Sequence, residues 1–464
     1  MDTTTFDPRE AFARRVVQQL TDAGHIAYFA GGCVRDRILG REAKDFDVAT
    51  NATPNRVREI FGQRRTLAIG AAFGVISVLG RKHKGEEPIE VATFRCDGSY
   101  SDGRRPDSVV FSSPEEDAKR RDFTINGLFY DPISERVIDF VGGVADLEHR
   151  CLRAIGDPEA RFEEDKLRML RAIRIATIFE FQIEPKTMEA ITHHASEIRT
   201  VSNERIGAEM RRLLAAPNVI DGLRLLLDSD LATIVFPPLC EFWNRDVQPQ
   251  PANKFIADPR SDGKALMSAL IDTRPVDRFI DAFACCLLTI AWTGGDLKQA
   301  VEALSDRWRL SNEEASRGLF ATESVPVIAQ AARLPYSQVQ PTLVHRYAGD
   351  AVRLAERVVR ACGQSVDGVE FASEQLKLDR SLLDPAPLVD GGTLHRLGLR
   401  SGPQFREILH DCALPSTRSA VKGRGFRDCI CPRAISLRLR LHCRLPLFED
   451  MLKMHPGDVG HVTG

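Results

Sequence analysis

The spacing of apolar residues changes along the chain and predicts two kinds of structure. Residues 10–21 carry apolar side chains at helical spacing, whereas Val- and Ile-rich runs such as AFGVISVLGR and IEVATFR are typical of short strands. From about 157 to 363 helical spacing dominates, as in EEDKLRMLRAIRIATIF, and strand patterns are scarce. The pattern therefore predicts a strand-rich α+β domain over roughly 20–150, followed by an all-helical region.

Length and composition are those of a globular protein with several domains. The 464 residues allow roughly two to four domains, and 43% apolar with 28% charged residues excludes a disordered chain. The first residues hold no apolar signal segment, and the longest apolar run, 282–292, is too short to cross a membrane. The 11 cysteines are odd in number and scattered, which favours reduced thiols. We therefore expect a cytoplasmic protein with no membrane partner.

The charge distribution limits how this chain could bind nucleic acid. The net charge is −2, so a nucleic-acid partner would have to be held by local basic patches. One such patch is predicted at 396–445, where eleven Lys and Arg residues stand against three Asp and Glu. Aromatic residues make up only 7% of the chain, which disfavours a binding surface of bases stacked on aromatic rings.

Gly31 and Gly32 lie between an apolar strand and a predicted helix. Glycine allows the backbone to approach a phosphate closely, and a helix N-terminus favours an anion. Arg35, one turn into the helix, could hold a phosphate oxygen. A glycine pair at a strand–helix junction is also typical of a plain turn, so the pair by itself leaves both interpretations open.

Three acidic residues suggest a metal site. Asp45 and Asp47 are two residues apart, so a strand would place both carboxylates on one face, where they repel unless a cation lies between them. Glu90 lies within the apolar strand IEVATFR, which is typical either of an edge strand facing solvent or of a third metal ligand. Oxygen ligands of this kind suit Mg²⁺ bound partly through substrate phosphates, as in two-metal phosphoryl transfer. An isolated Asp-x-Asp is also typical of an exposed strand end.

These motifs, in this order, resemble a known enzyme family. GGCVRDRILG, KDFDVATNATP, IEVATFR, EEDAKRRDFTINGL and EEDKLRMLRAIR are similar to the class II tRNA nucleotidyltransferases, the CCA-adding enzymes, whose head and neck bacterial poly(A) polymerases share. The resemblance is dense from about 26 to 215, weakens afterwards and returns at 387–409. It implies an α+β nucleotidyltransferase head with a mixed β-sheet, followed by an all-α neck, body and tail. The corresponding ranges are 1–150 for the head, 151–215 for the neck, 216–385 for the body and 386–464 for the tail, which is irregular after about 415.

The resemblance also implies a role for each matching position of the head. The glycine turn grips the triphosphate, the Asp-x-Asp pair binds metal, a third acid lies near the metals, and Arg-Arg-Asp contacts ribose and phosphate. The implied cofactor is Mg²⁺ in a two-metal site. An arginine pair is otherwise typical of a solvated charge run. In this sequence the turn falls on Gly31, Gly32 and Arg35, the acids on Asp45, Asp47 and Glu90, and the last motif on Arg120, Arg121 and Asp122.

The neck motif is implied to select the base of the incoming nucleotide. The resemblance places Asp165 and Arg168 at the base edge, with Arg171 and Arg174 toward the phosphates. A carboxylate accepts from the amino group of cytosine or adenine, and a guanidinium donates to the adjacent ring nitrogen; uracil and guanine present the opposite pattern. A spacing of three is otherwise typical of a salt-bridged helix face. The segment SNERIGAE at 202–209 resembles a supporting helix of the family and is predicted to be structural.

Several activities share this head, and the sequence leaves them open. The resemblance implies transfer of CMP and AMP from CTP and ATP to the 3′ end of tRNA, with the helical half binding the acceptor stem and elbow. The alternatives are addition of A alone, poly(A) tailing, or RNA binding by a protein with an inactive head. The polar segment 97–107 matches the family's flexible loop and favours A addition, and AIGAAFGVISVLG is of the tRNA-enzyme type.

Two further groups of residues are less tied to this function. His193 and His194 are predicted to lie at the surface of a helix. A structural zinc site is a second hypothesis for the C-terminal cysteines, because part of the set has Cys-x-Cys spacing. These cysteines are Cys412, Cys429, Cys431 and Cys443.

Overall fold

The structure is a computed structural model that describes most of the chain. The described residues are 7–70, 73–81, 83, 85–97, 109–243, 263–272, 279–292, 294–384, 392 and 395. The chain divides into two compact units. The first comprises Met1–Arg245, Pro275–Ala282 and Gln299–Ser311, and the second comprises Asp246–Arg274, Phe283–Lys298 and Asn312–Gly464.

A seven-stranded mixed sheet forms the centre of the first unit. Its strand order is β3-β4-β5-β2-β1-β8-β9, and β2 and β5 are its parallel neighbours, while the other neighbours run antiparallel. Two strand pairs lie outside this sheet, β6 with β7 and β10 with β11. The bounds are β1 Ala27–Ala30, β2 Asp47–Thr50, β3 Thr66–Gly70, β4 Val75–Val78, β5 Ile89–Thr93, β6 Arg95–Asp97, β7 Val109–Phe111, β8 Phe129–Asp131, β9 Arg136–Ile138, β10 Cys151–Leu152 and β11 Gln182–Ile183.

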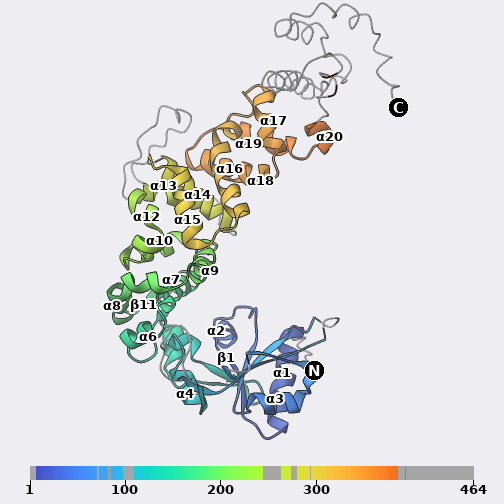
Figure 1. The fold of residues 1–464 in the computed structure, drawn as a ribbon, viewed down its shortest axis with the longest axis vertical. Helices are drawn as coiled ribbons and strands as arrows, with labels where there is room; N and C mark the ends of the chain where they lie inside the picture. Colours follow the sequence, from blue (N-terminus) through green and yellow to red (C-terminus); the bar gives the residue numbers. More distant parts are fainter. Residues whose placement is uncertain are drawn as a thin grey trace, which may run out of the picture. The chain divides into compact units, whose positions relative to one another are not determined.

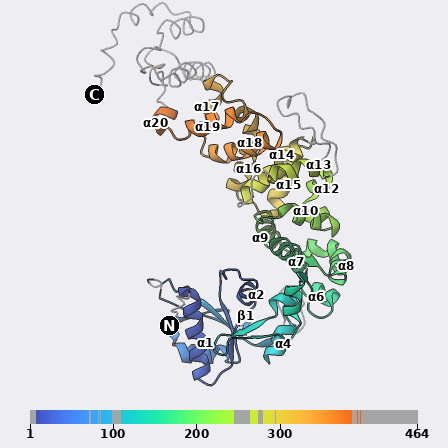
Figure 2. The same ribbon diagram turned by 180° about the vertical axis from the view of Figure 1, so that it is seen from behind.

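The two faces of the sheet carry different side chains. Because side chains alternate along a strand, Phe29 and Val48 point to one face, and Ala30 and Asp47 point to the other. Helices α1 (Pro8–Asp22) and α3 (Pro54–Phe61) pack against the sheet, as Figures 1 and 2 show. The face that carries Asp47 holds a separate buried cluster, whose members are Ala30, Ala49, Phe94, Ala118 and Phe129.

Helices continue the first unit after the sheet. Helix α7 has nine buried residues among its 13, and it packs against α9 and α10. The bounds are α2 Gly32–Ile38, α4 Pro114–Lys119, α5 Gly143–Glu148, α6 Pro158–Glu164, α7 Leu167–Phe179, α8 Pro185–His194, α9 Asn203–Leu214, α10 Val219–Asp228, α11 Ala232–Val235 and α12 Pro237–Phe242. Short 3-10 turns span η1 Gln63–Arg65, η4 Thr124–Asn126 and η5 Ala195–Thr200.

The second unit is helical in its described part. Helices α16 and α18 pack along each other around buried residues such as Ile328, Ala355 and Val359. Gly368 allows α19 to approach the end of α16, because a Cβ there would lie 2.3 Å from the carbonyl oxygen of Ala329. Most of α15 and the start of α14 belong to the first unit. The remaining helix bounds are α13 Gly263–Asp272, α14 Phe279–Trp292, α15 Leu297–Trp308, α16 Asn312–Ala329, α17 Tyr336–Val344, α18 Ala348–Ala361, α19 Asp367–Gln375 and α20 Arg380–Leu383.

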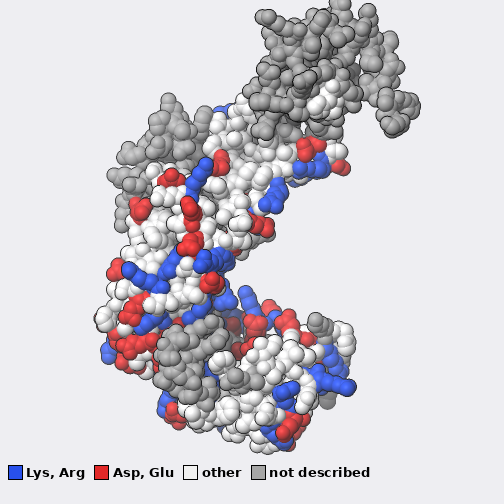
Figure 3. All heavy atoms as spheres, viewed as in Figure 1, with Lys and Arg blue, Asp and Glu red and all other residues white. Residues whose placement is uncertain are grey.

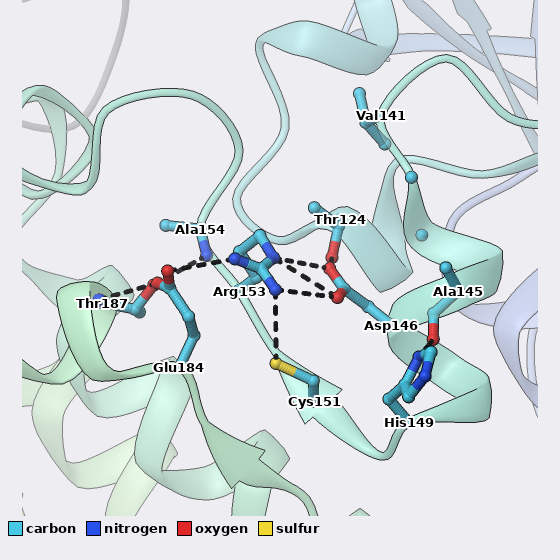
Figure 4. Close-up of polar contacts among 12 residues, drawn as sticks. Thr124, Val141, Ala145, Asp146, His149, Cys151, Arg153, Ala154, Glu184 and Thr187 are labelled. Carbon is cyan, nitrogen blue, oxygen red and sulfur yellow. Dashed lines mark hydrogen bonds and ion pairs between the residues drawn. The ribbon is translucent and has the colours of Figure 1, made fainter.

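One arginine joins the sheet-bearing part of the first unit to the helices that follow it (Figure 4). Arg153 follows β10, which pairs in parallel with β11. Its Nε donates to Asp146 of α5 at 3.1 Å, and its Nη1 donates to Glu184 at 3.0 Å. Thr124 also donates to Asp146, at 2.7 Å. Glu184 in turn caps α8 by accepting the N–H of Thr187 at 3.0 Å. These contacts fix the start of the helical neck on the head.

The predicted α+β fold with a helical second part is confirmed, and two local expectations need correction. Strand β2 begins at Asp47, so Asp45 precedes the strand. The strand begins there because its neighbour β1 ends at Ala30, the residue opposite Asp47, and offers no backbone partner beyond it. Helix α7 begins at Leu167, so Asp165 lies in an extended junction after α6. The head, neck, body and tail boundaries stay predictions.

Several predictions lie outside the described residues. They are most of the loop at 97–107, the basic stretch 396–445 and the four C-terminal cysteines. Among the described residues, seven cysteines are present and none forms a disulfide, and Cys285 and Cys286 are buried. No helix in the described ranges combines the length and apolar character needed to span a membrane.

Candidate active site

One cavity in the first unit brings together most of the residues singled out from the sequence. It has a volume of about 450 Å³. Its walls include every predicted site residue except Asp45 and Glu90. The lining residues are Gly31, Gly32, Arg35, Asp47, Arg120, Arg121, Asp122, Asn126, Asp165, Arg168, Arg171, Arg174 and Ile175. We call this cavity the cleft.

The three acids meet at the edge of the cleft. Asp47 at the start of β2 lies directly opposite Glu90 on the parallel strand β5, so both side chains leave the same face of the sheet. Strand β5 is interior, between β4 and β2, so Glu90 does not lie on an edge strand, although the residue is exposed to solvent. Asp45, Asp47 and Glu90 line a second cavity of about 310 Å³, and Asp47 belongs to both cavities.

The electrostatics of these acids fit a divalent cation. Desolvation by the surrounding protein atoms and the charges of Glu90 and Asp45 together raise the pKa of Asp47 to about 6, against an opposing effect of Arg121. Within the described part of the chain, no lysine or arginine forms an ion pair with any of the three carboxylates. Three oxygen donors with uncompensated negative charge are the ligand set that a hard divalent metal prefers.

The glycine turn forms one wall of the cleft. Gly31 has a φ of 73°, which favours glycine, and a Cβ there would lie 3.0 Å from Nη1 of Arg121. Arg35 is held in place by three partners. It donates to Oδ1 of Asn126 at 2.7 Å, pairs with Asp36 at 2.8 Å and lies over the ring of Phe179 at 4.2 Å. Helix α2 therefore holds the guanidinium of Arg35 in place, next to backbone at Gly31 that a phosphate can approach closely.

Arg120 and Arg121 are not a solvated charge run. Both donate to the buried carboxylate of Asp117, at 2.7 Å and 3.1 Å. Burial would raise the pKa of Asp117, but the two arginines outweigh burial and lower it. Our sequence analysis missed Asp117, although its spacing of three and four residues from the arginines on a helix was a usable signal.

Asp122 connects the head to α7. Its Oδ2 accepts from Nη2 of Arg171 at 2.7 Å and from Nε of the same residue at 3.0 Å. Its Oδ1 accepts from the amide of Asn126 at 3.0 Å. Burial would raise the pKa of Asp122, but Arg171 and the hydrogen bonds outweigh it and hold the pKa at about 2. Asn126, also missed from the sequence, thus holds both Asp122 and Arg35.

The ion pair of Asp122 predicts a pH-dependent stability. The pKa of Asp122, about 2, lies below the ordinary value of about 3.9. The contribution of this ion pair to the free energy of unfolding is therefore complete above about pH 4 and is lost as the pH falls toward 2. Asp122→Asn is expected to lower the free energy of unfolding by about 2–3 kcal/mol near neutral pH and by much less near pH 2. Urea unfolding at both pH values checks this, with Asp22→Asn on the exposed end of α1 as the control. If Asp122→Asn lowered the free energy of unfolding equally at both pH values, the low pKa assigned to Asp122 would be wrong.

The neck residues are held both by near neighbours in the chain, including an i, i+4 ion pair of Arg168 with Glu164, and by α9. Asp165 accepts the N–H of Leu167 at 3.0 Å and pairs with Arg205 of α9 at 2.7 Å. Arg168 donates to the carbonyl oxygen of Arg161 at 2.9 Å and also contacts Glu164. Asp165 and Arg168 therefore do not form the i, i+3 salt bridge that a plain charged helix face would show.

The helix predicted to be structural supplies the support for this wall. Arg174 of α7 donates to the buried Glu209 of α9 at 2.6 Å, and Arg171 lies 4.0 Å from the same carboxylate. Burial lowers the pKa of Arg174, and Glu209 opposes that effect. Basic side chains gather on the neck, at the height of α7 and α9 in Figure 1 (Figure 3). Arginines from the head and from α7 therefore line the cleft together with acids from both parts.

A mixed sheet with a glycine turn and acids on adjacent strands, beside an arginine-lined wall, defines the class of nucleotidyltransferases. Residues 27–153 match the poly A polymerase head domain, and residues 180–242 match the probable RNA and SrmB-binding site of polymerase A. The chain is 34% identical over 400 residues to the CCA-adding enzyme of Levilactobacillus brevis, covering 86% of this chain and 91% of that relative. It is 41% identical over 421 residues to that of Limosilactobacillus fermentum, covering 90% and 94%.

The structural comparison agrees with the sequence comparison. The crystal structure of the Bacillus stearothermophilus CCA-adding enzyme in complex with CTP superimposes with a TM-score of 0.69 at 26% identity, covering 94% of this chain and 99% of that chain. The chain belongs to the family of CCA-adding enzymes and is a nucleotidyltransferase. Membership implies a divalent metal, and the acids at the edge of the cleft fit such an ion.

Proposed function

We propose that this enzyme adds C and A residues from CTP and ATP to the 3′ end of tRNA. One observation supports the proposal: a single cleft is lined by a glycine turn, by the acid Asp47 and, on the neck, by both a carboxylate and a guanidinium, Asp165 and Arg168. The relatives are named for CCA addition, and the solved structure reported above is in complex with CTP. Since tRNA is the proposed substrate, we also place the activity in the cytoplasm.

The acids and the glycine turn would handle the triphosphate. We assign Asp45 and Asp47 as ligands of Mg²⁺, with Glu90 as a third acid beside them, because carboxylate oxygens and phosphates suit that ion. When bound, the metal would activate the 3′ hydroxyl and neutralise charge on the phosphates. Gly31, Gly32, Arg35 and Arg121 would bind the phosphates through backbone N–H groups and guanidinium donors. These donors orient the α-phosphate in line with the attacking hydroxyl.

The neck residues would choose the base. Asp165 keeps a carboxylate at the cleft wall, held by Arg205, and a carboxylate accepts up to about four hydrogen bonds. It can therefore accept the amino proton of cytosine or adenine while bound to Arg205. Arg168 would donate to the adjacent ring nitrogen. Asp122 would accept from the ribose 2′ hydroxyl and hold Arg171, with Arg174 toward the phosphates.

The proposal is tested by incubating the purified chain with tRNA that lacks its CCA end. CTP, ATP and both together are supplied with Mg²⁺, and the products are resolved at single-nucleotide length. CCA addition predicts C incorporation with CTP alone and a complete end with both nucleotides. Incorporation of A alone, only on tRNA ending in CC, would identify an A-adding enzyme. Long A tails on unstructured RNA would identify a poly(A) polymerase.

Affinity for tRNA is expected to depend strongly on salt. Basic side chains on the neck, together with the basic stretch 396–445, predict binding through phosphate contacts rather than base reading. Raising monovalent salt from about 50 to about 200 mM should weaken binding on the order of 100-fold. Filter binding of tRNA across this range measures the slope. A salt-independent affinity, or equal affinity for unstructured oligo(A), would contradict recognition of the acceptor stem and elbow.

A further inference from the structure

Two adjacent histidines and a glutamate meet away from the cleft. Helices α6 and α8 lie side by side in the neck (Figure 1). Nδ1 of His193 lies 2.9 Å and Nε2 of His194 lies 2.7 Å from the same carboxylate oxygen of Glu159. The three candidate ligand atoms all lie within 4.8 Å of one another. None of the three residues lines the cleft or the cavity that holds Asp45 and Glu90.

A second carboxylate orients the buried histidine. Nδ1 of His194 lies 2.8 Å from Glu197, whose other oxygen pairs with Lys166 at 2.6 Å. The His194 side chain is only 6% exposed, whereas that of His193 is 73% exposed. A histidine that gives one ring nitrogen to a carboxylate and points the other at a cluster has the arrangement of a metal ligand with its supporting partner. The expectation that both histidines lie at the surface is therefore correct for His193 and wrong for His194.

We propose that Glu159, His193 and His194 bind Zn²⁺. Two imidazole nitrogens with one carboxylate oxygen are a known zinc ligand set, while Mg²⁺ prefers oxygen ligands alone. Zinc–ligand distances of about 2.0–2.2 Å place ligand atoms about 3.4 Å apart in a tetrahedron. The two N–O contacts, at 2.9 and 2.7 Å, would have to lengthen, and the two histidine nitrogens already lie within 4.8 Å of each other. A tetrahedral zinc ion with these three ligands has one ligand position left. Water can occupy it, because the side chains of His193 and Glu159 are exposed to solvent.

The ion would connect the start of α6 to the end of α8. Glu159 lies in the first turn of α6 and the histidines lie in the last turn of α8. Helix α6 ends directly before Asp165, and Lys166 is tied to Glu197 of the same cluster. Zinc would therefore stabilise the pair of helices that leads into the base-selecting junction, without contacting the nucleotide.

The test measures zinc binding to the full chain after removal of metals with EDTA. Equilibrium dialysis against Zn²⁺ with elemental analysis is applied to wild type, His193→Gln, Glu159→Gln and the control His149→Gln. His149 is exposed and contacts a backbone carbonyl rather than an acid. We expect His193→Gln and Glu159→Gln to bind one equivalent fewer than wild type and the control. Glu197→Ala should keep the site but weaken it by about 10- to 100-fold.

Cobalt separates this site from the cysteines of the chain. Co²⁺ bound by nitrogen and oxygen shows visible d–d bands without the sulfur-to-cobalt charge-transfer band of a thiolate site. His193→Gln should lose the d–d bands of a nitrogen and oxygen site and leave any thiolate charge-transfer band unchanged. In a separate measurement, zinc should raise the unfolding midpoint of wild type but not of this variant. Equal zinc stoichiometry in wild type and His193→Gln, or loss of a thiolate band, would overturn the proposal. Because His193 is exposed, this variant is expected to fold.

Discussion

Asp47→Ala is expected to abolish incorporation of CMP and AMP while the protein stays folded. Asp47 is the acid shared by the cleft and the neighbouring cavity, so its loss would remove the proposed metal ligand beside the wall proposed to bind phosphate. The loss should amount to at least about 1,000-fold in kcat/KM, since charge stabilisation by the metal supplies several kcal/mol of the rate. Asp45→Ala should behave similarly, because the same cavity holds both acids. The measurement is labelled CTP and ATP incorporation into tRNA across a Mg²⁺ titration.

Stability distinguishes a catalytic loss from unfolding in these variants. Burial and the neighbouring acids raise the pKa of Asp47 to about 6, which means that its charge is disfavoured in the metal-free fold. Removing the carboxylate should therefore leave the unfolding midpoint in EDTA unchanged or slightly higher. Asp22→Ala, an exposed acid at the end of α1, is the control and should retain full activity. Substantial Mg²⁺-dependent activity in Asp47→Ala would refute the assignment.

Asp165→Ala is expected to change which nucleotide is used. The variant would remove the proposed acceptor for the amino group of cytosine and adenine, so UTP, whose O4 would otherwise face the carboxylate, should become relatively less disfavoured. A bidentate base contact is worth roughly 1–3 kcal/mol of discrimination, so the UTP-to-CTP ratio of kcat/KM should rise about ten-fold or more. Arg168→Ala should instead weaken CTP and ATP together, because both lose the donor to a ring nitrogen. Single-nucleotide incorporation with each NTP measures these ratios.

A matched ion pair elsewhere provides the control for this prediction. Arg224 and Asp228 on α10 form an exposed i, i+4 pair at 3.6 Å, with side chains 60% and 54% exposed. Arg224→Ala and Asp228→Ala should change neither selectivity nor activity. If Asp165→Ala keeps full activity and unchanged rejection of UTP, then Asp165 serves only to hold Arg205, and the base-selecting role is wrong.

The local chemistry of the sequence was sufficient to predict much of the fold and most of the residues that line the cleft. Apolar spacing predicted the α+β order, because the periods of strands and helices are properties of a short window. Motif order predicted the residues that line the cleft, from Gly31 to Arg174, since each motif combines residue types suited to phosphate, metal or base. The roles of these residues remain predictions that the variants above test.

Contacts between distant segments were decided only by the tertiary structure. The pairing of β2 with β5 places Glu90 beside Asp47 in the sheet interior, and no local pattern states which strands are neighbours. Asp165 leaves the predicted helix because its side chain caps α7 and pairs with Arg205, forty residues on. The meeting of Glu159 with His193 and His194 likewise depends on α6 packing against α8. A sequence contains the chemistry of each side chain and its near neighbours, whereas packing of the whole chain determines which distant groups share a charge, a proton or an ion.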